Sequence, residues 1–375
     1  MASDEQHQDR WIAARMRSIE SSGIRKVFEL ARSLKDPVNL SIGQPHFDVP
    51  DPIKAAAHAA IDRGANAYTV TQGIPELLGK IQDTVRCQYR HTDRQVVVTS
   101  GTSGGLVLAL CCTVNPGDEV IIFDPYFVMY PHVITLAGGT PVLLDTYPDF
   151  RIDADSVRAA ITSHTKAIIV NSPANPTGMV YPRACLRDLA LLAQERGILL
   201  LSDEVYRVFS YDEGFCSPAE FNEDVVVFDG FSKAYGMTGW RLGFAHGPRH
   251  VIEEMIKLQQ FSFVCAPSMV QHAGVAAWDY DVGGIVAEYR RKRDRAYAGL
   301  KDNFELVKPG GAFYLFPKAP GGTGTEFVAE AIRNNLLIIP GHIFSHSDSH
   351  FRLSYAADDR TLDRGLEILN RLARG

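Results

Sequence analysis

The chain has 375 residues, of which 46% are hydrophobic, and it carries a formal net charge of −6 at pH 7. This length exceeds what one hydrophobic core usually supports, so we expect one larger and one smaller domain. The acidic balance argues against general affinity for nucleic acid or for anionic membrane surfaces, and it favours small-molecule partners.

Six cysteines are spread along the chain without a CxxC pair or the His/Cys spacing of a metal site. Most lie in apolar segments, so we expect reduced core thiols, no bound metal and a cytoplasmic protein. Residues 1–17 are polar and lack the apolar stretch of a signal peptide. No run of residues is apolar for long enough to suggest a membrane span.

Helices and ordered loops alternate in the first part of the chain. Apolar spacing, prolines near helix starts and terminal glycines predict helices over 23–34, over 51–61 and onward from Pro75. A Gly- and Pro-rich loop over 40–50 contains Gly43. The polar connection over 68–73 contains Tyr68.

From residue 95, short β-branched runs alternate with helical ones. The predicted strands cover 95–99, 119–123, 140–144, 167–171, 198–201 and 225–228. The predicted helices between them cover 103–113, 129–137, 154–161 and 182–196. Apolar runs without alternation indicate strands buried on both faces, so we expect an α/β fold with a doubly wound, mostly parallel sheet. Ligands of such sheets bind at the carboxyl ends of the strands.

After residue 247 the pattern is helical, and a long charged helix over 284–303 leads into the last part of the chain. The elements predicted there are strands over 312–316, 336–339 and 351–355 and helices over 325–333 and 360–372. They predict a smaller α+β domain. We expect an N-terminal segment over 1–46 that contributes to this small domain, a large domain over 47–283 and the small domain over 284–375.

Lys233 stands in an unusual setting for a lysine. It lies among aromatic residues and glycines, with no other charge between Asp229 and Arg241. A lysine is normally a solvated surface residue. A desolvated lysine beside another cation has a lowered pKa and becomes a nucleophile that forms Schiff bases with carbonyl compounds.

The residues after the predicted strands are candidate partners of this lysine. The segment 99–105 offers hydroxyls, amides and a helix N-terminus suited to a phosphate, or a plain helix cap. Phe127 follows the second strand and offers an aromatic face, with core packing as the alternative. Asn175 lies in the proline-rich loop 171–178, which is otherwise an ordinary turn and in which the Asn-Pro bond is a candidate for the cis form.

Two charged residues complete the set. Asp203 ends a predicted buried strand, where it either caps a helix or pairs with a protonated ring nitrogen, and Tyr206 lies on the same turn. Arg352 stands on an apolar strand and is suited to bidentate carboxylate recognition, with a surface arginine as the alternative.

In their order along the chain, these segments resemble the class I/II aminotransferases, the fold type I enzymes that depend on pyridoxal phosphate. The segment 232–243 is the most specific match, and the segments 175–178 and 203–206 support it. Matching motifs run from Gly43 to Arg352. The resemblance implies transfer of an amino group from an L-amino acid to a 2-oxo acid such as 2-oxoglutarate or pyruvate.

The resemblance also implies a role for each residue. Lys233 would hold the cofactor and shuttle a proton at the substrate, Asp203 would pair with the ring nitrogen, and Tyr206 and Asn175 would donate to the phenolic oxygen. Phe127 would stack on the ring. The phosphate would be held by Gly101, Thr102, Ser103, Ser232 and Arg241.

Substrate and subunit contacts follow from the same resemblance. Arg352 would bind the substrate carboxylate, assisted by Asn175 and the backbone of Gly43. Tyr68 of the partner subunit would reach the phosphate, which implies a homodimer. Many relatives have Trp where this chain has Phe127, and the segment 263–268 is less typical, so both bear on substrate preference.

Two other functions fit parts of this pattern. A carbon-sulfur lyase would use the same site for β-elimination. A pyridoxal-phosphate-binding regulator would carry a DNA-binding domain, and no basic helix-turn-helix precedes Gly43. The side chain of the amino donor is left open, because no second arginine stands out as a reader of a dicarboxylate. Aspartate, alanine, aromatic and branched-chain donors all fit.

Overall fold

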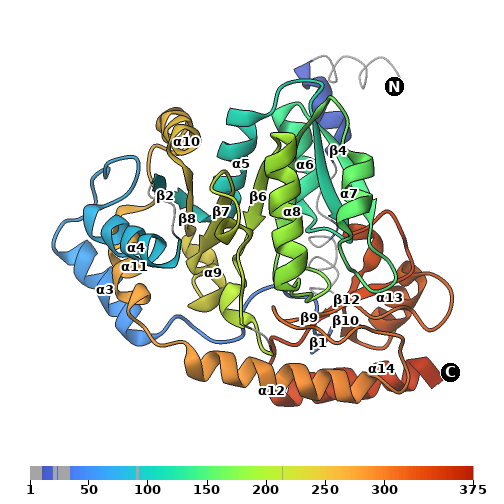
Figure 1. Cartoon of the computed structure of the whole chain (residues 1–375). Helices are drawn as coiled ribbons and strands as arrows, with labels where there is room; N and C mark the ends of the chain where they lie inside the picture. Colours follow the sequence, from blue (N-terminus) through green and yellow to red (C-terminus); the bar gives the residue numbers. More distant parts are fainter. Residues whose placement is uncertain (1–10, 20–22, 24–33, 90–92, 213, 375) are drawn as a thin grey trace.

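The computed structural model describes residues 11–19, 23, 34–89, 93–212 and 214–374, so nearly all of the helix predicted over 23–34 lies outside the described residues. A seven-stranded sheet with the order β2-β8-β7-β6-β5-β3-β4 forms the centre of the larger part (Figure 1). Its strands are β2 (Arg94–Ser100), β3 (Glu119–Asp124), β4 (Thr140–Asp145), β5 (Thr165–Asn171), β6 (Leu199–Asp203), β7 (Val226–Gly230) and β8 (Leu242–Pro248). Neighbouring strands from β4 to β7 are parallel. The predicted α/β fold with a mostly parallel sheet is confirmed.

Strand β8 is absent from the sequence-based prediction, and it runs antiparallel to both β2 and β7. Its sequence, LGFAHGP, is interrupted by glycines, which weaken a strand signal. Gly243 is needed here because a Cβ at this position would lie 2.6 Å from the carbonyl carbon of Gly101. The glycine therefore lets the start of the helix that begins at Gly101 approach β8 closely. Strand β4 also departs from the prediction, since it is an edge strand that is only partly buried.

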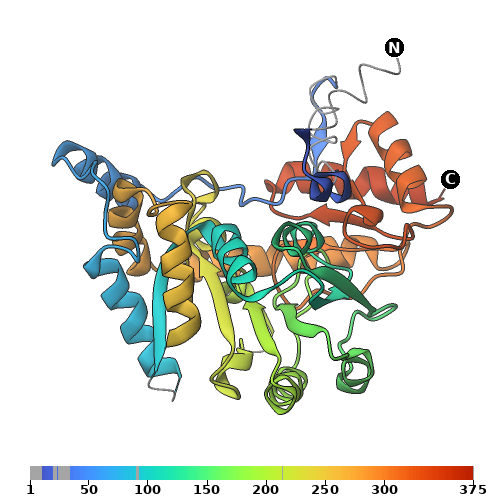
Figure 2. The same cartoon turned by 90° about the horizontal axis from the view of Figure 1, so that it is seen from above.

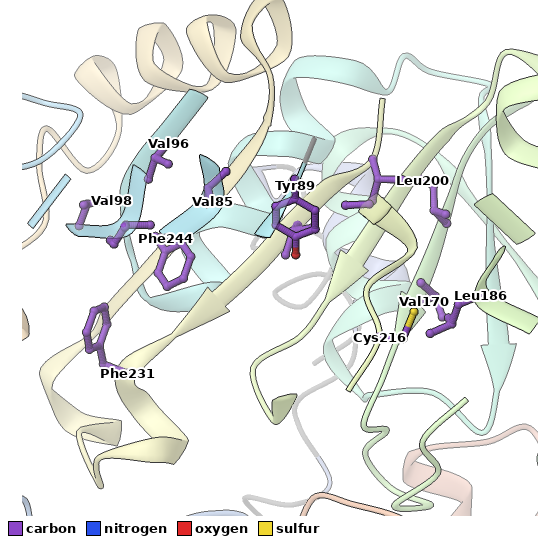
Figure 3. Close-up of a cluster of buried hydrophobic side chains, with 14 of the residues drawn as sticks. Val85, Tyr89, Val96, Val98, Val170, Leu186, Leu200, Cys216, Phe231 and Phe244 are labelled. Atoms are coloured by element: carbon purple, nitrogen blue, oxygen red, sulfur yellow. The ribbon is translucent and has the colours of Figure 1, made fainter. Parts of the chain in front are cut away.

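Helices cover both faces of the sheet. One face packs against α4 (Pro75–Gln88), α8 (Arg183–Arg196) and α11 (Ser268–Trp278), with α3 (Asp51–Asp62) against α11 and α7 (Ala154–Ala160) against α8. The other face packs against α5 (Gly101–Thr113), α6 (Met129–Ala137) and α10 (Arg249–Phe261). Figure 3 shows part of the hydrophobic core on the first of these two faces, in which Phe231 lies near Phe244 and Val98. Burial of Phe231 fixes the start of the short helix α9 (Phe231–Ala234), which carries Lys233.

The C-terminal part has its own core, beneath the long helix α12 (Gly283–Leu300). It contains an antiparallel sheet of order β11-β12-β9 and a parallel pair of β1 and β10. The elements are β1 (Val38–Asn39), β9 (Tyr314–Leu315), β10 (Leu336–Leu337), β11 (Ile339–Pro340), β12 (Phe351–Ser354), α13 (Gly324–Arg333) and α14 (Asp359–Arg374). Because β1 pairs with β10, residues 38 and 39 pack with this part, and the chain then crosses to α3 (Figure 2). The α+β character is as expected, and the domain limits at 46/47 and 283/284 stay a prediction.

Shorter features complete the described chain. The 3-10 helices are η2 (Ala14–Ser18), η3 (Arg207–Phe209), η4 (Pro218–Glu220), η5 (Thr238–Trp240) and η6 (Gly341–Ile343). All six cysteines are free, but only Cys216 is buried and both Cys87 and Cys111 are exposed, so the expectation of core thiols was wrong for most of them. Among the described residues, no helix has the length and apolar character needed to cross a membrane.

Candidate active site at the carboxyl ends of the strands

A cavity of about 320 Å³ lies at the carboxyl ends of the parallel strands, where the C-terminal part meets the sheet. It is lined by Ile42, Gly43, Gln44, Thr102, Ser103, Leu106, Phe127, Asn171, Asn175, Asp203, Val205, Tyr206, Ser232, Lys233, Thr238, Arg241, Tyr314 and Arg352. Most of the predicted site residues are therefore brought together. Gly101 lies directly against Arg241. Tyr68 is the exception, since it lies on the surface with 84% of its area exposed.

Lys233 projects into this cavity from α9. Its Nζ donates a hydrogen bond of 2.8 Å to the carbonyl oxygen of Gly43. Burial lowers the pKa of Lys233 to about 8, and the charges of Arg352 and Arg241 act in the same direction, whereas Asp203 opposes them. The amine is thus available in its neutral, nucleophilic form near physiological pH.

Asp203 ends β6 and is buried, with one oxygen accepting a 2.8 Å hydrogen bond from the hydroxyl of Tyr130. Burial raises the pKa of Asp203 to about 6, and the bond from Tyr130 acts against that rise. A buried carboxylate without an ion-pair partner is costly. Asp203 is therefore suited to a cationic group in the cavity, such as a protonated ring nitrogen.

Arg352 lies on β12 and is only 1% exposed. Its Nη1 donates to Asn175 Oδ1 at 3.0 Å and its Nη2 to the carbonyl oxygen of Ser41 at 2.8 Å. The guanidinium stacks over the rings of Tyr314 and Phe344, at 4.6 and 4.5 Å from their centroids. Its Nε has no hydrogen-bond partner, and no carboxylate of the described residues forms an ion pair with it. A buried cation in this state favours an anionic ligand.

A second cation stands at the start of α5. Arg241 adopts left-handed backbone angles (φ 57°), and a Cβ at Gly101 would come within 2.5 Å of its guanidinium. Its Nη1 donates only to the carbonyl oxygen of Thr238. Helix α5 begins without a side-chain cap, and Thr102 Oγ1 is buried with no partner among the described residues. Free amides, an orphan hydroxyl and a guanidinium form a donor set that fits a phosphate group.

Asn175 and Tyr206 lie between these groups. The side chain of Asn171 donates to the carbonyl oxygen of Asp203 at 2.9 Å and accepts the amide of Asn175 at 2.8 Å, which fixes the loop after β5. The Asn175-Pro176 bond is cis. The hydroxyl of Tyr206 lies 2.8 Å from that of Tyr314. The cavity therefore fits the cofactor that the sequence resemblance implies. Around Lys233 it offers the carboxylate of Asp203, the hydrogen-bond donors of Tyr206 and Asn175, and an anion site.

Several residues in the cavity or in contact with its lining were not anticipated. Asn171 and Val205 adjoin predicted site residues, so their place follows from that proximity. Tyr130 and Tyr314 gave no such signal, because each looks like an ordinary aromatic residue in a helix or a strand. Their contacts with Asp203 and Tyr206 span 73 and 108 residues and exist only in the folded chain.

Comparisons with known proteins agree with this geometry. A model of the family "Aminotransferase class I and II" matches residues 35–369. The chain is 38% identical over 374 residues to a probable aspartate aminotransferase of Methanocaldococcus jannaschii, covering 96% of this chain and 99% of that protein. It is 33% identical over 384 residues to aromatic-amino-acid aminotransferase 2 of Thermococcus litoralis, with 97% and 98% covered. The structure of the aspartate aminotransferase from Thermus thermophilus with maleate superposes with a TM-score of 0.91 at 34% identity, covering 96% and 99% of the two chains.

Proposed function

Because the chain belongs to the class I and II aminotransferases, pyridoxal-phosphate-dependent enzymes that move an amino group from an amino acid to a 2-oxo acid, we propose that the cavity between Lys233 and Arg352 is its active site. One observation carries this proposal. A lysine with a pKa near 8 shares its cavity with a buried arginine that has no carboxylate partner in the part of the chain that the structure describes. The first suits a carbonyl cofactor and the second suits a carboxylate substrate.

The residues around the cavity divide the binding of the cofactor among them. Asp203 would hold a proton on the ring nitrogen, and Phe127 would offer an aromatic face to the ring. Tyr206 and Asn175 donate hydrogen bonds to the phenolic oxygen. The phosphate is bound by Gly101, Thr102, Ser103, Ser232 and Arg241. When bound, pyridoxal phosphate supplies a cationic ring that accepts electron density from the substrate Cα.

Arg352 and Lys233 act on the substrate. Arg352 binds the α-carboxylate, and its bond to Asn175 Oδ1 fixes the plane of the guanidinium for that contact. With the cofactor bound, Lys233 would move a proton at the substrate Cα. The carbonyl oxygen of Gly43 accepts a hydrogen bond from its Nζ and holds the amine beside the Gly43 loop.

The cavity also bears on which amino acid serves as the amino donor. Arg241 and Arg352 are the arginines that line the cavity among the described residues, and with Arg241 at the phosphate a single arginine is left for the substrate. We propose aspartate and aromatic amino acids as the donors to test first, because the relatives carry those names. A second carboxylate would then be met by uncharged donors such as Gln44 or by a partner subunit.

A homodimer in the cytoplasm is the proposed working form. Exposed apolar side chains gather at two places, with Tyr68 and Val70 on one loop and with Phe261, Phe263 and Val264 at the end of α10 and on the loop after it. Two buried glutamines hold the first loop: the side chain of Gln259 donates to the carbonyl oxygen of Thr71 at 2.7 Å, and that of Gln271 to Thr69 Oγ1 at 3.0 Å. A second copy packed on this surface would place Tyr68 of the partner subunit toward the phosphate.

The test is a panel of amino acids assayed with 2-oxoglutarate and with pyruvate, together with ultracentrifugation of the holoenzyme. The expected result is keto-acid formation that requires an oxo-acid acceptor, from a dimer. Release of pyruvate from cystathionine without any acceptor would instead identify a carbon-sulfur lyase. A purified protein that gains no visible absorbance with added pyridoxal phosphate would contradict the proposed site.

A further inference from the structure

Two tyrosine hydroxyls meet in the wall of the cavity. Tyr206 follows β6 in the larger part and Tyr314 lies on β9 in the C-terminal part, and their oxygens are 2.8 Å apart. The rings meet edge to face, with centroids 5.8 Å apart and an interplanar angle of 83°. Both side chains are buried, with 4% of Tyr206 and 0% of Tyr314 exposed. Each hydroxyl therefore depends for its partners on the protein or on a ligand in the cavity.

Proton counting makes the direction of this bond important. Each phenol carries one proton and two lone pairs. Tyr206 can donate to a ligand in the cavity only if its proton is not already given to Tyr314. Among the described residues, Tyr314 has no hydrogen-bond partner for its hydroxyl other than Tyr206. The hydroxyl of Tyr314 therefore depends on Tyr206, whereas the hydroxyl of Tyr206 has a second possible partner, a ligand in the cavity.

The surroundings favour Tyr314 as the donor. The guanidinium of Arg352 lies over its ring, 4.6 Å from the centroid. Burial raises the pKa of both hydroxyls, and at Tyr314 the charge of Arg352 is the next largest influence and lowers the pKa. If Tyr206 gives its one proton to a ligand in the cavity, its oxygen must accept the bond from Tyr314, because each phenol has a single proton to donate. The more acidic phenol is the better donor.

We propose that Tyr314 is a positioning residue that donates its hydroxyl proton to Tyr206, so that the proton of Tyr206 points at the phenolic oxygen of the cofactor. This inference rests on the proposed role of Tyr206. A chain of two hydroxyl bonds polarises each member, so Tyr314 also strengthens the bond that Tyr206 donates. Tyr314 lines the cavity, and in this role it acts on the cofactor through Tyr206.

The expected effect concerns the proton shared by the nitrogen of Lys233 and the phenolic oxygen of the bound cofactor. A donor at that oxygen stabilises its negative charge and weakens its hold on the shared proton. Removing the Tyr314 hydroxyl weakens this donor, so the shared proton is retained to higher pH. The pH midpoint of the cofactor's visible absorbance in the substrate-free holoenzyme reports this directly.

The experiment compares Tyr314→Phe, Tyr206→Phe, the double variant and the control Tyr355→Phe. Tyr355 is a fully buried tyrosine of the same core that does not line the cavity, and its hydroxyl donates to the backbone carbonyl oxygens of Gly311 and Ala312. We expect the midpoint to rise by about half a unit in Tyr314→Phe and by more in Tyr206→Phe. It stays at the wild-type value in Tyr355→Phe. The double variant matches Tyr206→Phe, because Tyr314 has nothing left to act through.

The outcomes separate this inference from the function it rests on. An unchanged midpoint in Tyr314→Phe, together with a shift in Tyr206→Phe, overturns the role of Tyr314 alone. A further shift in the double variant also overturns it, because Tyr314 then acts by another route. No shift in either single variant overturns the role of Tyr206 and the inference with it. If Tyr314→Phe fails to fold, 3-fluorotyrosine at position 314 replaces it: this more acidic phenol should lower the midpoint, and an unchanged or raised midpoint overturns the proposal.

Discussion

The Nζ of Lys233 donates a 2.8 Å hydrogen bond to the carbonyl oxygen of Gly43, which lies 190 residues earlier in the chain. This contact joins the helix after β7 to the loop that follows β1. It gives the amine a fixed position before any ligand is present. The same burial that makes this bond possible lowers the pKa of Lys233 to about 8.

The pH dependence of cofactor capture follows from that pKa. Only the neutral amine attacks a carbonyl, so the rate at which the apoprotein gains visible absorbance should rise with pH up to about 8 and then level off. An ordinary exposed lysine would give a rate that keeps rising toward its pKa of about 10.4. Stopped-flow absorbance at a series of pH values distinguishes the two. Lys233→Ala should show no such phase, and a rate still climbing at pH 10 would contradict the lowered pKa.

Removing the Tyr130 hydroxyl should weaken cofactor binding. Tyr130 donates to Asp203, and loss of that bond lets the pKa of Asp203 rise further above its ordinary value. We expect Tyr130→Phe to lower the affinity for pyridoxal phosphate about tenfold, with a larger loss at pH 6 than at pH 8. Fluorescence titration of the apoprotein measures this. Tyr89→Phe, which alters a buried tyrosine under the opposite face of the sheet, should bind normally at both pH values.

Arg352 should govern recognition of the substrate carboxylate. Arg352→Leu removes a buried cation that is already aligned by Asn175 and Ser41, so kcat/KM for every amino acid should fall by about 10²- to 10³-fold. Arg352→Lys keeps the charge but not the planar fork, and it should recover only part of this loss. Steady-state kinetics with two unrelated donors gives the comparison. A variant of the exposed Arg371 on α14 serves as the control, and an equal loss there would count against a specific role.

Glu204 should make the fold less stable as pH rises. It is buried, accepts hydrogen bonds from Ser202 and Ser217, and burial raises its pKa to about 8. The native state therefore keeps a proton that the unfolded chain releases near its ordinary pKa, and the free energy of unfolding falls between about pH 4.5 and pH 8. Glu204→Gln should flatten this part of the profile in denaturant titrations. Glu253→Gln on the exposed face of α10 should leave the slope intact.

The sequence predicted those parts of the site that follow strands. Asp203, Asn175 and the turn at Gly101 could be found because parallel strands end at one edge of the sheet, so a local pattern predicts a shared location. Lys233 could be found because its neighbours carry no charge. Arg352 lies in a separate part of the chain, and its assignment to the same site rested on the family resemblance.

Other parts could not be read locally. The side chains of Tyr130 and Tyr314 acquire their importance from partners far along the chain. Strand β8 was missed because glycines, which the close approach of α5 requires, disrupt its strand pattern. Tyr68 was assigned to a partner's site, and its 84% exposure in the single chain leaves that assignment a prediction.

The antiparallel strand β8 also sets the order in which the sheet can be completed during synthesis. In the described sheet, β2 is an edge strand whose neighbour is β8, with Arg94 opposite Pro248 and Ser100 opposite Leu242. During synthesis β2, the first strand of this sheet, therefore stays unpaired until β8, the last strand, has been made. Pairing the two then carries the entropic cost of closing a long loop. The anion site between the turn at Gly101 and Arg241 forms at that closure. A chain stalled before β8 can hold several parallel strands and still have no place for the phosphate.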